Sequence, residues 1–97
     1  MKSPREKIRA QMNKEAYEEW FKVVIKLKTA NEAEEFFRDL FSSSEIKDIT
    51  RRLKCARLLY EENTFQQIEE LLGMGSPTIN KIHFKTKGSR ILPKLFS

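Results

Sequence analysis

The chain has little of what enzymes commonly use for chemistry. Among its 97 residues one is cysteine, Cys55, and one is histidine, His83. These two residues make no internal disulfide and no four-ligand zinc site. The sequence also has no glycine-rich phosphate loop. The adjacent acidic pairs 61–62 and 69–70 point to different sides of a helix, unlike convergent catalytic carboxylates. We therefore predict that the protein is not an enzyme and holds no metal.

Glycine and proline are scarce, with three of each. Because Glu, Lys, Leu and Ile are abundant instead, this composition favours helices over a turn-rich sheet. No apolar run approaches the roughly 20 residues that cross a bilayer. Residues 1–6 lack the apolar core of a signal peptide. We expect an all-α, cytoplasmic protein that forms a single domain over residues 1–97 and has no membrane partner.

Acidic residues are absent after Glu70, although the chain contains 14 of them. The 19 basic residues divide into 14 before this position and five after it, so the net charge of +5 lies in the final 27 residues. Evenly mixed charge is usual on a solvated face, whereas a segment of one sign indicates a surface that meets a polyanion. The charge distribution therefore narrows the partner to nucleic acid or an anionic membrane.

Capping signals and apolar spacing divide the chain into about five helices. Ser3-Pro4 combines a capping side chain with proline at the first helical position, and it opens a segment of some 25 residues with helical spacing. Capping pairs begin three more helices, at Asn31 with Glu34, Ser42 with Glu45 and Thr64 with Gln67, and Ser43 or Ser44 is an alternative cap for the second of these. Ser76-Pro77 repeats the first signal, and Gly88 ends that helix before a tail over 88–97.

The first predicted helix is too long and too apolar to be covered by one small domain. At 1.5 Å per residue, 25 residues extend for about 38 Å. Apolar side chains between Phe21 and Leu27 lie on more than one face of it. A chain this short buries little surface for its length. We therefore predict that a second copy packs against residues 1–60, which form the dimerisation helices.

Residues 64–85 have the spacing of a helix-turn-helix. Gly73 stands at the turn, where this motif needs a left-handed backbone. Apolar residues stand where the two helices would cross: Ile68, Leu72, Met74, Ile79 and Ile82. The second helix begins with small polar residues, which suit the base edges and phosphates of a DNA major groove. We predict that bases are read by Ser76, Thr78, Asn80 and Lys81, and that phosphates are bound by Lys85 and Lys87.

The main alternative is an ordinary helical hairpin, because Glu69 stands where the first helix of the motif usually carries alanine. The chain would then be a protein-interaction module without specific DNA binding. Two independent features favour DNA, since the acid-free segment begins at the second helix of the motif. Other residues are assigned to packing. Trp20, Tyr17 and Phe21 belong to the core or the dimer, Cys55 belongs to the core, and Phe84 holds its helix against the domain.

Several short motifs occur in an order that resembles the Trp-repressor family of bacterial regulators, including its YerC/YecD-type branch. The motifs are Glu19-Trp20, Asp39-Leu40-Phe41, Glu45-Ile46-Lys47-Asp48-Ile49, Arg52-Leu53, Gly73-Met74-Gly75 and Thr78-Ile79-x-Lys81. They span most of the chain, from Tyr17 to about Lys87.

The resemblance implies an intertwined helical homodimer whose helix-turn-helix heads face successive major grooves. Such a dimer is a sequence-specific, nucleoid-associated regulator of transcription, and most simply a repressor. Its pseudo-palindromic operator has half-sites roughly 34 Å apart. In this architecture the central helix lies over the DNA backbone, so Arg51 and Arg52 would bind phosphates.

The resemblance also implies a place for a corepressor. In tryptophan-responsive members, two arginines sandwich the indole of L-tryptophan. Arg52 matches the first arginine, Lys81 stands at the second, and Ser42 lies near a threonine contact. A lysine lacks the flat face that stacks on an indole, Ile82 replaces a glycine, and Lys85 replaces the serine that holds the amino group. We expect no cofactor to be required, with L-tryptophan or another small effector as the alternative.

Overall fold

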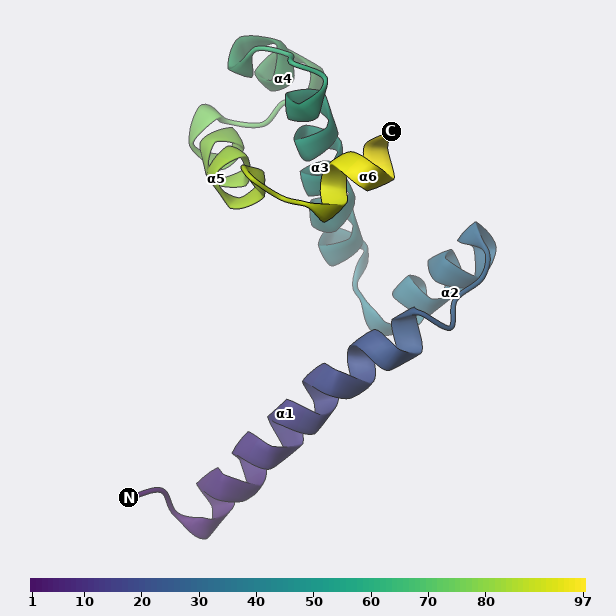
Figure 1. The fold of residues 1–97 in the computed structure, drawn as a ribbon, viewed down its shortest axis with the longest axis vertical. Helices are drawn as coiled ribbons and strands as arrows, with labels where there is room; N and C mark the ends of the chain where they lie inside the picture. The colour runs from purple at the N-terminus through teal and green to yellow at the C-terminus, as the bar shows by residue number, and fades with distance from the viewer. The chain divides into compact units, whose positions relative to one another are not determined.

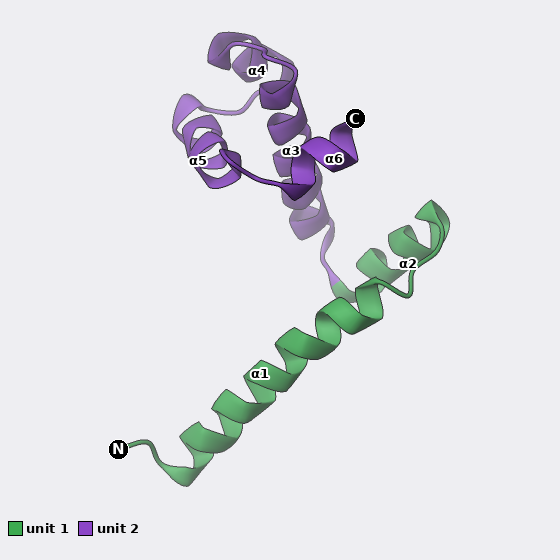
Figure 2. Cartoon of the chain, in the orientation of Figure 1, with its two compact units in different colours: residues 1–40 green, residues 41–97 purple.

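The computed structural model describes residues 1–97 as six helices without a strand, which confirms the all-α prediction (Figure 1). The helices are α1 (Pro4–Val24), α2 (Ala30–Leu40), α3 (Ser43–Tyr60), α4 (Phe65–Leu72), α5 (Ser76–Thr86) and α6 (Ile91–Phe96). Two compact units divide the chain, unit 1 over Met1–Leu40 and unit 2 over Phe41–Ser97 (Figure 2).

Three helices begin at the capping residues that the sequence predicted. Ser42 begins α3, where its Oγ accepts a hydrogen bond from the Glu45 amide (3.1 Å) and its own amide donates to the Glu45 carboxylate (2.9 Å). The Ser42 amide, followed by its hydroxyl, holds the pKa of the Glu45 carboxyl below its ordinary value. Ser3 and Thr64 form the same reciprocal pairs at the starts of α1 and α4. Each such cap contributes about 1 kcal/mol to helix stability.

The predicted start of α2 at Asn31 was wrong by two residues. Thr29 caps this helix instead, because its Oγ1 accepts from the Glu32 amide (3.1 Å) while the Glu32 carboxylate accepts from the Lys28 amide (3.2 Å). Thr29 and Glu32 have the same spacing as Asn31 and Glu34, so the sequence offered two equivalent starts. The earlier start adds helical residues, and it leaves Glu34 to pair with Arg38 one turn later (2.6 Å).

Unit 1 contains two helices but no fully buried side chain. Its best-packed group is Trp20 of α1, whose ring lies 5.3 Å from Phe36 and 6.3 Å from Phe37, both on α2. The large apolar side chains that remain exposed are Met1, Ile8, Met12, Tyr17, Phe21, Ile25 and Leu40. Within one chain, unit 1 therefore has an aromatic contact between its helices but no closed core.

Unit 2 has a core in which α3, α4 and α5 all pack against one another. Its buried residues are Cys55, Ala56, Leu58, Ile68, Ile79 and Ile82. They include three of the five residues predicted at the helix crossing, and Leu72 and Met74 pack against them, partly buried. Burial raises the pKa of the Cys55 thiol, so this cysteine is a neutral core residue, as predicted.

The predicted tail over 88–97 contains a helix that the sequence did not reveal. The Ser89 hydroxyl accepts from the Leu92 amide (3.2 Å) at the start of α6, whose Leu92 and Phe96 pack against the core. The Phe96 ring lies 5.6 Å from Tyr60 of α3. Six residues are too few for a periodic pattern, and Pro93 looks like a helix breaker. Proline is tolerated in a first turn, where its missing amide has no intrahelical partner.

Candidate nucleic-acid interface

Helices α4 and α5 lie where the helix-turn-helix was predicted and are joined by the turn over residues 73–75. Gly73 has φ 62° and ψ 32°, the left-handed conformation expected there. Its amide donates to the Glu69 carbonyl (2.8 Å) and closes the end of α4. A Cβ at Gly73 would meet no atom within 4 Å. The requirement for glycine at this position is therefore conformational rather than steric.

The start of α5 differs from the prediction. Gly75, not Ser76, occupies the capping position, and no side chain caps the helix. Ser76 is already helical, and Pro77 follows it within the first turn. The amides of Thr78 and Ile79 both donate to the Gly75 carbonyl (3.1 Å each). The backbone thus closes this turn by itself, which leaves the hydroxyl of Ser76 exposed and unbonded.

One side of α5 is buried, and the exposed side is polar except for Phe84. Ile79 and Ile82 are buried in the core, while the predicted DNA-binding residues of α5 are all exposed. Thr78, Lys81 and Lys85 recur at helical spacing on one flank. Asn80 is rotated by about 200° from Thr78 at 100° per residue, so it lies on the opposite flank.

The prediction that Phe84 packs α5 against the domain was wrong. This side chain is 63% exposed, because the buried stripe of α5 runs through Ile79 and Ile82 and leaves Phe84 on the outer face. Its ring contacts His83 (5.4 Å between centroids) and lies 5.8 Å from the Lys87 ammonium. Lys87, a predicted phosphate ligand, is the residue that directly follows α5. Its ammonium group lies over the exposed ring of Phe84.

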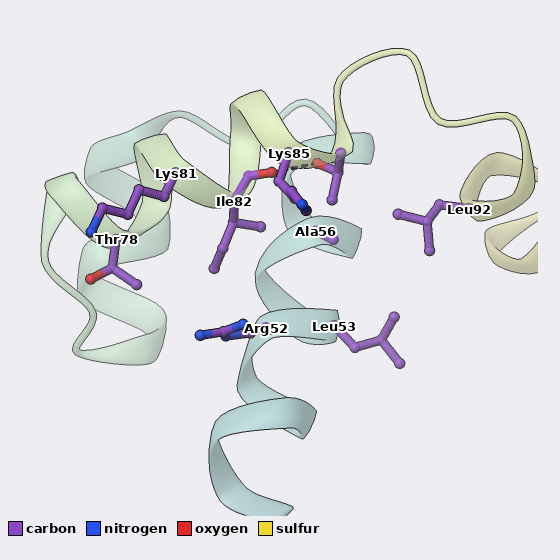
Figure 3. Close-up of a pocket in the computed structure, with 9 residues that line it drawn as sticks. Arg52, Leu53, Ala56, Thr78, Lys81, Ile82, Lys85 and Leu92 are labelled. Carbon is purple, nitrogen blue, oxygen red and sulfur yellow. Dashed lines mark hydrogen bonds between the residues drawn. The ribbon is translucent and has the colours of Figure 1, made fainter. Parts of the chain in front are cut away.

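A pocket of about 430 Å³ lies between α3 and α5 and brings four predicted site residues together (Figure 3). It is lined by Arg52, Leu53, Ala56, Thr78, Lys81, Ile82, Lys85, Thr86 and Leu92. We call it the α3–α5 pocket. Arg52 comes from the central helix, and the other three predicted residues, Thr78, Lys81 and Lys85, come from one flank of α5. Sequence reasoning missed Leu92, because this residue comes from the unpredicted helix α6.

A second pocket of about 330 Å³ lies beside the turn. It is lined by Asp48, Arg51, Arg52, Gly73, Met74, Gly75 and Thr78, so it shares two residues with the α3–α5 pocket. Its two arginines differ in environment. The Arg51 guanidinium donates to the Leu72 carbonyl at the end of α4 and is half-buried, whereas Arg52 is exposed and makes no hydrogen bond within the chain.

We expect Arg51→Ala to lower the free energy of unfolding by about 1–2 kcal/mol, because it leaves a helix-end carbonyl without its charged donor. The matched change Arg52→Ala is expected to cost less than about 0.5 kcal/mol, since that side chain is exposed and unpaired. Urea denaturation followed by circular dichroism measures both values. Equal losses in the two variants would contradict the assignment of Arg51 to the support of the turn.

No ion pair involves the cations that line the α3–α5 pocket, although Asp48 lines the adjoining pocket at the turn together with Arg52. The chain has two ion pairs, Glu34 with Arg38 and Arg57 with Glu61, and neither involves a residue that lines this pocket. The three cations of the pocket are Arg52, Lys81 and Lys85. Because no acidic residue follows Glu70, no carboxylate of the last 27 residues neutralises them.

Four predicted residues lie outside both of these pockets: Ser42, Ser76, Asn80 and Lys87. Ser42 caps α3, and its hydroxyl is occupied by the Glu45 amide. Ser76 and Asn80 are exposed on α5 but line neither pocket. The structure therefore does not bring Ser42 together with Arg52 and Lys81, which were the other two candidate effector ligands.

The unit 2 architecture, with two short helices packed on a longer one and an unpaired basic flank, defines a small all-helical domain of the kind that regulators of transcription use. Residues 15–92 match the Trp repressor protein family. The chain belongs to this family, as its motifs had indicated. The family is one of DNA-binding regulators rather than enzymes. No helix in the structure is both long enough and apolar enough to span a membrane.

A curated relative is the uncharacterized protein YerC of Bacillus subtilis strain 168, which is 37% identical to this chain over 62 residues. The match covers 64% of this chain and 60% of YerC. No solved structure matches the chain significantly.

Proposed function

We propose that the protein is a homodimeric, sequence-specific regulator that reads a pseudo-palindromic operator in double-stranded DNA and acts as a repressor. The observation that carries this proposal is the two-sided character of α5. Its apolar side is buried in the core, while its exposed side carries polar and cationic residues within a segment that has no acid. At 11 residues, α5 is about 16 Å long, which suits insertion into a major groove about 12 Å wide.

The proposed contacts divide by chemistry. Base edges are read by four exposed residues of α5, Ser76, Thr78, Asn80 and Lys81, with Thr78 and Lys81 on one flank of the helix and Asn80 on the other. Phosphates are bound by Lys85, Lys87 and Arg52, which are exposed and free of ion pairs. Arg51 stabilises the turn between α4 and α5, because its guanidinium donates a hydrogen bond to the Leu72 carbonyl at the end of α4.

The homodimer is proposed because unit 1 lacks a closed core. A segment of 40 residues without one buried side chain does not bury enough surface to be stable alone. A second copy offers the same exposed apolar residues of α1 and α2 and so would cover them symmetrically. Two copies also provide the two reading helices that a pseudo-palindromic operator needs.

We further propose that DNA binding requires no cofactor. Ile82 is 8% exposed and belongs to the core, so its side chain occupies the place where tryptophan-responsive relatives have a glycine. Adding L-tryptophan is therefore expected to leave the affinity for DNA unchanged within about twofold, as measured by fluorescence anisotropy. A tenfold gain would correspond to about 1.4 kcal/mol and would contradict this proposal.

Asn80→Ala tests base reading. We expect it to cost about 1–3 kcal/mol at one base position and to relax the preference there, because a side-chain amide recognises a base edge with paired hydrogen bonds. Operators selected from genomic fragments, with single-base variants of each, provide the measurement. Gln66→Ala on the exposed face of α4 is the control. Equal losses on cognate and random duplex would reject Asn80 as a base-reading residue.

Lys87→Ala tests the phosphate contacts. We expect weaker binding to all sequences alike and a salt dependence of log K that is flatter by about one unit, since one counterion fewer is released. Lys26→Ala, an exposed lysine of unit 1, controls for net charge. If wild-type protein binds no duplex even at about 50 mM salt, the helical interaction module replaces the DNA-binding regulator as the better function.

A further inference from the structure

One exposed side chain of α5, Phe84, neither belongs to the core nor carries a hydrogen-bonding group. It is 63% exposed, whereas the other two large apolar residues of the helix, Ile79 and Ile82, are buried in the core of unit 2. We propose that the Phe84 ring reads a thymine of the operator by packing against the 5-methyl group of that base. This inference rests on the proposed DNA binding and adds an apolar contact to the polar ones.

Phe84 lies at the centre of the exposed face of α5. At about 100° per residue, it is rotated by roughly 140° from Ile79 and by roughly 160° from Ile82, so it faces away from the core. Asn80 lies about 40° to one side of Phe84, and Lys81 lies about 60° to the other. The ring therefore stands between two residues that are proposed to read bases, on the face that would enter the groove.

The position of Phe84 along α5 also fits a base contact. Asn80 and Phe84 are four residues apart, so their Cβ atoms lie about 5–6 Å apart on the helix surface, and successive base pairs are roughly 3.4 Å apart. The thymine is therefore placed about one or two base pairs from the base that Asn80 reads. Side chains on a helix lean toward its N-terminus, so the ring covers the turn before it, nearer the end of the helix that reads bases.

Contacts within the chain hold the ring in place before DNA is bound. The half-buried His83 ring lies 5.4 Å from the Phe84 ring and 5.7 Å from the ring of Phe65 on α4. The Lys87 ammonium lies 5.8 Å from the centroid of the Phe84 ring. A side chain that is already ordered loses less entropy when it binds. Lys87, a proposed phosphate ligand, is thus held beside the ring, so both can contact the same stretch of duplex.

The chemistry of the ring selects the thymine methyl group. In the major groove the edges of adenine, guanine and cytosine present hydrogen-bonding groups, whereas thymine also presents an apolar methyl group. An apolar protein surface would cover the ring as well, but it would leave Asn80 and Lys81 on either side without water or a partner. No acidic residue follows Glu70, so the charge of this segment favours a polyanion. The duplex therefore matches both the ring and its polar neighbours.

Uracil substitution tests the contact, because uracil differs from thymine only by lacking the methyl group. Each thymine of the selected operator is replaced in turn, and the Kd of the full chain is measured by fluorescence anisotropy. We expect one thymine of a half-site at which uracil raises the Kd of the wild-type chain about fourfold, since a buried group of this size contributes about 0.8 kcal/mol. We expect Phe84→Ala to bind the thymine and uracil duplexes equally.

Leu71→Ala is the matched control, since it removes a side chain of α4 that is 65% exposed. We expect this variant to keep the fourfold difference. Phe84→Leu retains an apolar side chain and is expected to keep a difference of at least about twofold. Thermal melting verifies that each variant folds.

Different results would reject the contact and the proposed function. Specific binding in which no uracil substitution matters, or a methyl effect that persists in Phe84→Ala, rejects the contact and leaves the proposed function intact. A homodimer that is weakened in Phe84→Ala without any methyl effect, as measured by sedimentation, assigns the ring to the second copy instead. A wild-type chain that binds no duplex rejects the proposed function and this contact with it.

Discussion

Ile79→Ala is expected to lower the free energy of unfolding by about 2–5 kcal/mol, the usual cost of emptying an isoleucine site in a core. Ile79 is 0% exposed and belongs to both the core of unit 2 and the helix proposed to read DNA. A small domain has about 5–15 kcal/mol of stability in total, so this loss is a large share of it. Urea denaturation at a fixed protein concentration measures it, since the stability of a dimer depends on concentration.

Leu71→Ala is the matched control for this experiment. Leu71 lies in α4 within the same helix pair, but it is 65% exposed, so we expect a change below about 0.5 kcal/mol. Ile79→Val is expected to lie between the two, at about 0.5–1.5 kcal/mol, because it removes a single methylene. A loss from Leu71→Ala as large as that from Ile79→Ala would mean that the core has been placed on the wrong side of these helices.

The double substitution Met12→Gln with Phe21→Gln is expected to raise the dissociation constant of the proposed homodimer at least about 100-fold. Both side chains are 51% exposed in the single chain and lie on α1. Burial of such side chains contributes about 1.5–3 kcal/mol each, and about 1.4 kcal/mol corresponds to a factor of ten. Operator affinity should fall by about 10²–10⁴, because the two reading helices no longer bind as one unit. Sedimentation and anisotropy measure the two effects.

Lys14→Gln with Lys22→Gln is the control, since it introduces the same residue at two exposed polar positions of the same helix. We expect this variant to remain dimeric. The interpretation of unit 1 would be refuted by a wild-type chain that sediments as a clean monomer at micromolar concentration. It would also be refuted if both double variants weakened the dimer equally.

Most of the fold was predictable because its signals are local. A reciprocal capping pair such as Ser42 with Glu45 needs only four consecutive residues, and three such helix starts are confirmed. The start of α2 was misjudged because two overlapping pairs satisfy the same rule. Helix α6 was missed for the opposite reason. Its short segment has no periodicity of its own and is held by contacts of Leu92 and Phe96 with distant parts of the chain.

The candidate site was predictable as a set of residues but not as an arrangement. The acid-free segment and the helix-turn-helix spacing selected the exposed polar residues of α5. The neighbours Arg51 and Arg52 were both predicted from the sequence to bind phosphates. Only the fold assigns the first to the Leu72 carbonyl and the second to the α3–α5 pocket.

By itself the sequence determined where α1, α3 and α4 begin, that Gly73 turns the chain, and where the net positive charge lies, because each of these depends on neighbouring residues or on simple counting. The tertiary structure decided which cations are free, that Phe84 faces outward, and that Arg52 of α3 meets Lys81 and Lys85 of α5 around one pocket. These facts depend on the packing angle between helices that are distant in the chain, and no local pattern encodes that angle. The helix-turn-helix segment is thereby joined to the central helix through a shared cationic pocket.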